Sequence, residues 1–317
     1  MGKRERVAKD RWIHHLITVE ESGRSVQEIL TGPLAVSRRM IQRLTRTRGI
    51  RLNGRSPRLS GRVKARDRLS VRVAAAEEPG LTPVQMDLRI VFEDADLIVV
   101  DKPPSLTVHP TSESHKRTLA HGIAHHFLTS GAAARVRPLH RLDRDTSGLV
   151  VIARTEYAHQ HLDRQLRQGA LKRSYLALAE GSISGDAGTI DEPIGRKPGN
   201  PNLRAVMPDG EPAVTHYRVL ARDQEMTLLE LELETGRTHQ IRVHLAFLGH
   251  PIVGDRQYGA AARTGITRQA LHAHRVSFVH PMSGQDIRLE APLPADLSVL
   301  VGQVQTVRGR SGVSPSG

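Results

Sequence analysis

The sequence predicts an α+β protein with a small N-terminal α/β domain and a large domain built on a mixed, mainly antiparallel sheet. The 317 residues, 38% of them hydrophobic, can bury one large and one small core. Pro, Gly and Glu without periodicity over residues 74–84 mark a linker between the two. Beyond the linker, helical segments separate strand-like segments at irregular intervals, which favours an antiparallel or mixed sheet over a doubly wound parallel one.

Residues 1–13 are expected to form a basic flexible arm, and residues 14–73 a folded unit with helices first and a hairpin last. Ser37 is placed to cap a helix, because the apolar side chains after it recur at helical spacing. A short alternating strand then leads into Asn53-Gly54, a strong hairpin-turn signal. A second alternating strand closes the domain.

The large domain is expected over residues 85–300, followed by a small, polar, flexible tail at residues 301–317. It opens with LRIVFEDADLIVVDKP, which reads as two short strands around an acidic turn. Later strand-like segments are GLVVIA, RSYLALAEG and MTLLELELETG, and helical segments are TEYAHQHLDRQLRQ and HQIRVHLAFLG.

Positive charge is concentrated near the N-terminus. The formal net charge is +13, and residues 1–73 hold nineteen Lys and Arg against six Asp and Glu, so the remainder balances at twenty-seven against twenty-seven. A one-sided excess indicates a surface for a polyanion, with nucleic acid the expected partner. An anionic membrane is disfavoured, because turns interrupt the basic region and it lacks a long amphipathic helix.

The arginines of the predicted N-terminal helix lie mostly off its apolar stripe. So few carboxylates intervene that a phosphate-binding surface is favoured over a solvated helix face. The segment resembles the alpha-L RNA-binding module of ribosomal small-subunit protein four, with SRRMIQRL as helix, IRLNG as strand and VKARDRLSVRV at the end. The resemblance implies binding to folded RNA, and the expected RNA contacts here are Arg38, Arg39, Arg43, Arg46 and Arg51.

Several classes of function are disfavoured because the chain lacks the residues that they require. With no cysteine, the chain has no disulfide, thiolate metal site or cysteine nucleophile. Its seventeen histidines include no HExxH pattern, so no metal is predicted, and no GxxxxGK[ST] loop is present for a nucleotide. There is no run of about twenty apolar residues and no secretory pattern at the start, so a cytoplasmic location is expected.

The stretch HRLDRDTSGLVVIA is the most informative for chemistry. Its apolar end predicts a buried strand, and the polar residues before it form a loop that brings His140, Arg141, Asp143 and Asp145 to one sheet edge. From the residues alone, either carboxylate could instead cap a turn or pair with Arg141. Paired carboxylates for glycoside hydrolysis are disfavoured, because side chains two apart on one loop need not face one bond.

The same stretch resembles the signature of the RluA family of RNA pseudouridine synthases, an HRLD box followed by Thr-Ser-Gly and a hydrophobic strand. Other family motifs follow the same order: DKPPSLTVHP before it, then LKRSYLALAEG, TGRTHQIRVHLAFLGHPIVGDRQYG and ALHAHRVSFVHP after it. The resemblance covers about residues 85–296 and implies the pseudouridine synthase fold.

The resemblance also implies roles for individual residues. Asp143 matches the catalytic aspartate, which acts at the sugar carbon that bears uracil, so that the base detaches, rotates and rejoins through carbon five. Arg242 matches the arginine that pairs with it, Tyr175 the active-site tyrosine that stacks on the base, and Arg141 a residue that fills the space of the extruded nucleotide. His140 and Arg237 are expected to hold loops or contact RNA. No cofactor is required, since uridine and pseudouridine are isomers.

The function that follows is isomerisation of specific uridines in structured RNA, with large-subunit ribosomal RNA as the expected substrate. Two alternatives stay open at this point. One is a synthase acting on transfer RNA, and the other a non-catalytic RNA-binding factor in ribosome assembly. A monomer is expected.

Overall fold

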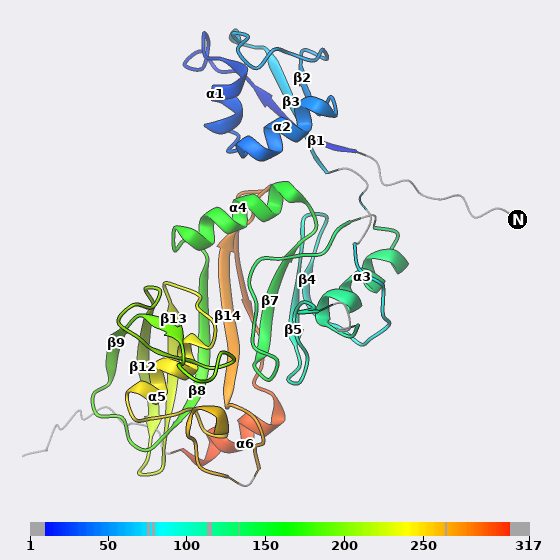
Figure 1. The fold of residues 1–317 in the computed structure, drawn as a ribbon. Coiled ribbons are helices and arrows are strands. Elements are labelled where there is room, and N and C mark those ends of the chain that lie inside the picture. The colour runs from blue at the N-terminus through cyan, green and yellow to red at the C-terminus, as the bar shows by residue number, and fades with distance from the viewer. Residues whose placement is uncertain are drawn as a thin grey trace, which may run out of the picture.

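The computed structural model describes residues 10–74, 77, 80–112, 116–132, 134–263 and 265–304. Figure 1 shows a small N-terminal domain, in blue, next to a large domain built on one long sheet. The small domain has a three-stranded antiparallel sheet of order β1-β3-β2 and two helices. Its elements are β1 (Arg11–Leu16), α1 (Val26–Thr31), α2 (Arg38–Arg46), β2 (Ile50–Leu52) and β3 (Arg68–Ala74).

The small domain begins with a strand, which corrects the expected order of helices first. Strand β1 pairs with β3, so Arg11–Ile13 are not part of a flexible arm, and the rest of the expected arm, residues 1–9, lies outside the described residues. Trp12 and Ile13 favour an extended chain, and Ile13 packs on the domain core. Ala74, the first residue of the expected linker, is the last residue of β3.

The predicted cap and turn are both present. The Ser37 hydroxyl accepts a hydrogen bond from the Met40 amide at 3.2 Å, which satisfies an otherwise unpaired donor of α2. Asn53 and Gly54 have φ angles of 49° and 84°, and Leu52 and Arg55 exchange backbone hydrogen bonds across them. The predicted closing strand is also present, as β3, which begins at Arg68.

The large domain has a ten-stranded mixed sheet, as the sequence predicts. Its order is β4-β5-β7-β14-β8-β13-β12-β9, with β15 on β14 and β6 on β7, and among these pairs β7 and β14 run parallel and the others antiparallel. The strands are β4 (Arg89–Glu93), β5 (Leu97–Lys102), β6 (Arg137–Pro138), β7 (Ser147–Ala153), β8 (Lys172–Glu180), β9 (Ala187–Asp191), β12 (Val214–Arg222), β13 (Met226–Leu233), β14 (Leu271–Val279) and β15 (Asp286–Glu290). Strands β10 (Ile194–Arg196) and β11 (Arg204–Val206) form a separate pair.

Helices cover the ends and faces of this sheet (Figure 1). Helices α4 and α5 lie where the sequence predicts them, whereas α3 was not predicted. Helix α6 extends past the expected domain end at residue 300, because Leu297 and Leu300 pack into the main core; residues 305–317 lie outside the described residues. The bounds are α3 (Leu119–Thr129), α4 (Glu156–Arg167), α5 (Gln240–Phe247), a 3-10 turn η1 (Arg256–Tyr258) and α6 (Ala295–Gln303).

The small domain packs on α4 of the large domain. Tyr157 of α4 is buried in the small-domain core, and its hydroxyl donates to the Leu34 carbonyl at 3.3 Å. The side chain of Gln160 accepts from the Ser37 amide at 3.0 Å and donates to the Ala35 carbonyl at 3.3 Å. These contacts set the position of the basic domain relative to the large domain.

Candidate active site

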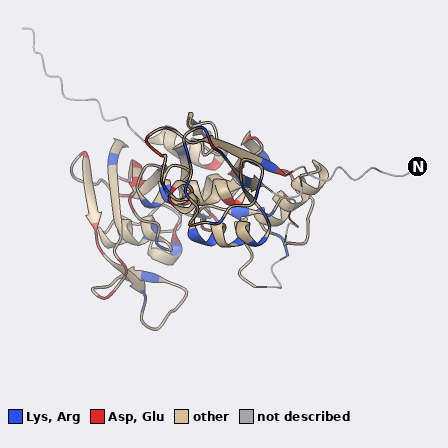
Figure 2. Cartoon of the chain, turned by 90° about the horizontal axis from the view of Figure 1, so that it is seen from above, with Lys and Arg blue, Asp and Glu red and all other residues tan. Residues whose placement is uncertain are grey.

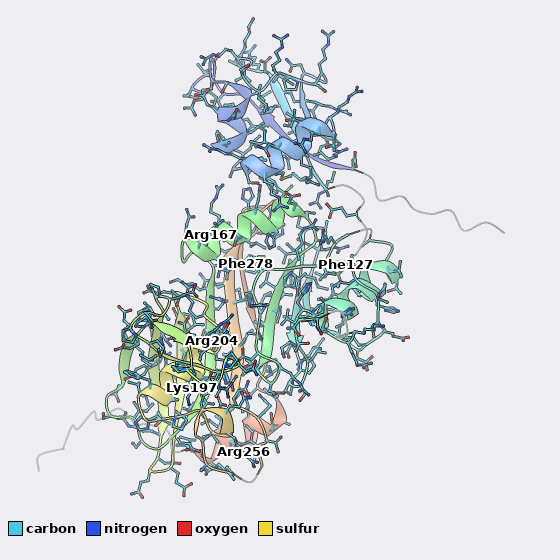
Figure 3. All side chains as sticks on the ribbon, in the orientation of Figure 1. Phe127, Arg167, Lys197, Arg204, Arg256 and Phe278 are labelled. Carbon is cyan, nitrogen blue, oxygen red and sulfur yellow. The ribbon has the colours of Figure 1, made fainter. Side chains whose placement is uncertain are left out.

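A cleft of about 820 Å³ opens in the large domain between the HRLD loop and the loop before α5. Side chains from β8, from the end of β13 and from the start of α5 line it. The lining also includes residues of the HRLD loop. The four residues that the sequence predicts in one site all line the cleft: Asp143, Tyr175, Arg242 and Arg141. Arg167, labelled at the end of α4 in Figure 3, also lines the cleft.

Lys102, the last residue of β5, holds the HRLD loop in place by hydrogen bonds to backbone carbonyls. Its side chain is fully buried, and its ammonium group donates to the carbonyls of Pro103 at 2.9 Å, Leu106 at 2.8 Å and Arg144 at 3.0 Å. Burial lowers the pKa of Lys102 to about 7. Because one of these carbonyls belongs to the residue after Asp143, Lys102 fixes the backbone that presents the carboxylate.

Gly148 brings the strand after this loop against β14. Its φ is 112°, and a Cβ atom there would collide with the backbone of Ala273. Only glycine fits this approach, which explains the glycine that follows Thr146 and Ser147.

Asp143 is held by Arg242 in a paired network. Nη1 of Arg242 donates to Oδ2 of Asp143 at 3.0 Å. The opposite edge of the guanidinium forms a two-point pair with Asp255, with Nε to Oδ2 at 2.6 Å and Nη2 to Oδ1 at 2.8 Å. Nη2 also contacts Oε1 of Gln257 at 2.8 Å. These carboxylates raise the pKa of the buried Arg242, so its charge is permanent.

Two rings complete the surroundings of this pair. The Arg242 guanidinium lies over Tyr258, with its carbon 4.8 Å from the ring centroid. Nδ1 of His239 is 2.8 Å from the Tyr258 hydroxyl, and its Nε2 is 3.9 Å from Oδ2 of Asp143. His239 holds a left-handed backbone conformation (φ 60°), and burial lowers its pKa.

Tyr175 lies on β8 and is only 4% exposed, with its ring among the core side chains that border the cleft. Arg141 is exposed at the cleft. Arg237 lines it too, but Nη1 contacts Glu211 at 3.1 Å. The His140 residue is half-buried, but Nδ1 of its ring is fully buried, and its Nε2 accepts from the Val151 amide at 3.3 Å, so it ties the loop to β7.

Sequence reasoning did not assign roles to Lys102, Asp255, Gln257 or Tyr258. The signal was present, because these residues stand within the motifs DKPPSLTVHP and GHPIVGDRQYG. Their pairing with the catalytic loop and with Arg242 depends on segments that meet only in the fold.

The comparisons with known proteins identify the family of the chain. A family model described as RNA pseudouridylate synthase matches residues 96–247. The RNA pseudouridine synthase YhcT of Bacillus subtilis (strain 168) is 42% identical over 294 residues, which cover 92% of this chain and 97% of that protein. The chain belongs to the RluA family of RNA pseudouridine synthases.

Other relatives of this pseudouridine synthase carry names that specify a substrate. Ribosomal large subunit pseudouridine synthase D of Nitrosomonas europaea is 43% identical over 249 residues, which cover 75% of this chain and 72% of that protein. Among solved structures, human RNA pseudouridylate synthase domain containing 1 matches 69% of this chain and 89% of its own, with 27% identity and a TM-score of 0.55. The predicted α+β pseudouridine synthase fold is confirmed.

The arginines expected to bind RNA in the small domain differ in their surroundings. Arg38, Arg39, Arg46 and Arg51 are exposed, and Figure 2, which looks onto this domain, marks its lysines and arginines in blue. Arg43 is half-buried instead and pairs with Glu156 of α4 at 2.7 Å. It joins the two domains, which makes it a poor candidate for RNA contact.

Away from the cleft, Asp94, Asp96 and His280 place one ligand atom each within 4.8 Å of one another. His280 and Asp94 lie 2.7 Å apart, and Arg11 pairs with Asp96, so these groups are already engaged in ion pairs. Within the described part of the chain, no helix is long and apolar enough to cross a membrane.

Proposed function

We propose that this pseudouridine synthase isomerises specific uridines of large-subunit ribosomal RNA, with Asp143 as the catalytic group. The observation that carries the proposal is the position of the Asp143 carboxylate, at the cleft and 3.0 Å from a guanidinium that is itself fixed by Asp255. The names of relatives such as the Nitrosomonas protein support the choice of RNA.

In the proposed reaction, Asp143 acts at the sugar carbon that bears uracil, and the bond from that carbon to the base nitrogen breaks. The detached uracil turns within the cleft, and its carbon five forms the new bond to the sugar while the Asp143 carboxylate is released. Carbon five then loses its proton and the freed base nitrogen takes one up, so that the product is an isomer of the substrate. Arg242 holds Asp143 ionised and aligned. Tyr175 offers a ring on which the base stacks, and Arg141 occupies the space that the extruded nucleotide leaves.

The small domain, expected over residues 14–73, is proposed to be an RNA-binding module of the alpha-L type. Its exposed arginines, Arg38, Arg39, Arg46 and Arg51, supply phosphate contacts, whereas the cleft selects the nucleotide. Contacts of α4 with the small domain hold these arginines and the cleft in a fixed relative position.

A pseudouridine map of ribosomal and transfer RNA tests the substrate. The host lacks this protein and is complemented with the wild type or with Asp143→Asn. We expect particular pseudouridines of large-subunit ribosomal RNA to disappear and only the wild type to restore them. Loss confined to transfer RNA would replace the proposed substrate, and equal restoration by Asp143→Asn would remove Asp143 from the mechanism.

A further inference from the structure

One buried arginine of the cleft has no side-chain partner among the residues that the structure describes. Three arginines are buried among the described residues: Arg173, Arg242 and Arg268, with 9%, 4% and 8% exposure. Arg242 pairs with two carboxylates, and Arg268 forms a two-point pair with Asp296 at 2.7 and 2.9 Å. The side chain of Arg173 makes no hydrogen bond or ion pair within the described ranges, and its Nε is buried without an acceptor.

The Arg173 side chain is directed into the cleft. It stands two residues before Tyr175 on β8, and side chains two apart on a strand share one face. Both line the same cleft as Asp143. A Cβ atom on Gly236 would lie 3.7 and 3.8 Å from the Arg173 Nη atoms, so the guanidinium lies beside the loop before α5.

His140, whose titration the Arg173 charge affects, does not neutralise Arg173. His140 lines the same cleft, and burial together with the Arg173 charge lowers the pKa of His140 to about 3. His140 is therefore neutral near pH 7. The Arg173 guanidinium therefore lowers the stability of the fold unless an anion binds to it. Burial removes part of its hydration, and no ion pair compensates for that loss.

We propose that Arg173 binds a phosphate of the RNA backbone beside the target uridine. A guanidinium presents parallel N–H donors that match phosphate oxygens. Arg173 lies about 6.6 Å along the strand from Tyr175, which is within the span of one nucleotide whose base stacks on that tyrosine. A neutral uracil carbonyl would leave the positive charge uncompensated. The inference rests on RNA as the substrate and adds a residue that anchors the extruded nucleotide.

The first test separates binding from structure and needs no RNA. Arg173→Met keeps the length of the side chain and removes the unpaired charge, and Lys172→Met removes a charge from the exposed neighbour on the other sheet face. We expect the melting temperature of Arg173→Met to equal or exceed that of the wild type, because a buried unpaired charge is lost. A fall of several degrees beyond that of Lys172→Met would show a structural role and overturn the proposal.

The second test locates the phosphate. The full-length enzyme converts a short RNA around the mapped uridine, with the phosphate on either side replaced in turn by a neutral methylphosphonate. On the RNA without a methylphosphonate, kcat/KM should fall about 30-fold for Arg173→Met and by a smaller factor for Arg173→Lys. It should stay unchanged for Lys172→Met. One of the two methylphosphonates should lower wild-type kcat/KM similarly and abolish the difference between wild type and Arg173→Met.

If Arg173→Met loses the same factor on all three RNAs, Arg173 contacts the base or acts indirectly and the proposal is wrong. If it loses nothing on the unmodified RNA, no phosphate is bound there. Wild-type turnover of that RNA reports separately on the proposed function, so the two can fail independently.

Discussion

Arginine serves two different purposes in the two domains. In the cleft, Arg242 is buried and every edge of its guanidinium contacts an acceptor, so the side chain has a single position. On the small domain, Arg38 and Arg39 are exposed, and no ion pair involves them within the described residues. Paired buried charge defines geometry, whereas unpaired exposed charge attracts a polyanion without fixing it. Rate and affinity should therefore respond to different substitutions.

The largest expected effect is on the rate. Asp143→Asn keeps the shape of the side chain but removes its charge, so we expect turnover to fall by about 10⁴-fold or more. RNA affinity should change by less than threefold, because a carboxylate does not attract phosphate. Single-turnover conversion at saturating RNA and equilibrium binding measure the two quantities. A rate loss below tenfold would contradict the catalytic role.

Asp255→Asn should affect both rate and stability. It leaves the buried Arg242 with one carboxylate in place of two, so we expect the free energy of unfolding to fall by about 3 kcal/mol. Turnover should fall by about 100-fold, because Asp143 loses its fixed partner. Chemical denaturation and single-turnover kinetics measure these effects.

The matched control is Asp186→Asn, which breaks the pair with Arg222 at 2.8 Å. Asp186 is 77% exposed there, and surface pairs contribute less than about 1 kcal/mol. Equal destabilisation by both variants would contradict the importance of the buried pair.

Affinity should respond to the small domain. Replacing Arg38, Arg39, Arg46 and Arg51 together with Gln should lower the slope of log affinity against log salt by about 3, since each phosphate contact contributes about 0.7–0.9. The rate at saturating RNA should stay within twofold of the wild type. An unchanged salt slope would mean that the RNA lies elsewhere.

The last expected effect, which is absent near neutral pH, is on the pH dependence of stability. Because the pKa of His140 is about 3 in the folded chain, below its ordinary 6.5, the unfolded chain binds more protons between these values. Stability is therefore lost as the pH falls from 6.5, by at most about 3 kcal/mol at pH 4. His140→Gln should flatten this part of the curve. Parallel curves for the two proteins would show that His140 is not buried in its neutral form.

Much of the fold could be predicted from local patterns. The Ser37 cap, the Asn53-Gly54 turn and the buried strand after the HRLD box each depend on a few adjacent residues. Strand β1 was missed because its six residues lie beside a basic stretch and pair with β3, more than fifty residues away. Such a partner leaves no local signal.

The same distinction holds for the active site, where the motif residues could be predicted and the contacts between distant segments could not. Motif resemblance placed Asp143, Tyr175 and Arg242 together, and the cleft indeed contains all three. It could not show that Asp255 fixes Arg242, or that Arg43 pairs with Glu156 of α4. Both facts depend on which segments the fold brings together, and a charge pattern on one helix does not reveal the acidic side chain opposite it.

Release of tritium from RNA labelled at carbon five of uridine, measured against RNA concentration, separates the catalytic role of Asp143 from the binding role of the small domain. Pseudouridine formation replaces that hydrogen with the bond to the sugar, so each turnover releases one label. We expect that Asp143→Asn releases almost none at any concentration, while the four-arginine variant reaches the wild-type rate at higher RNA concentration. If both variants lost maximal rate by the same factor, the division between a catalytic cleft and a binding domain would be wrong.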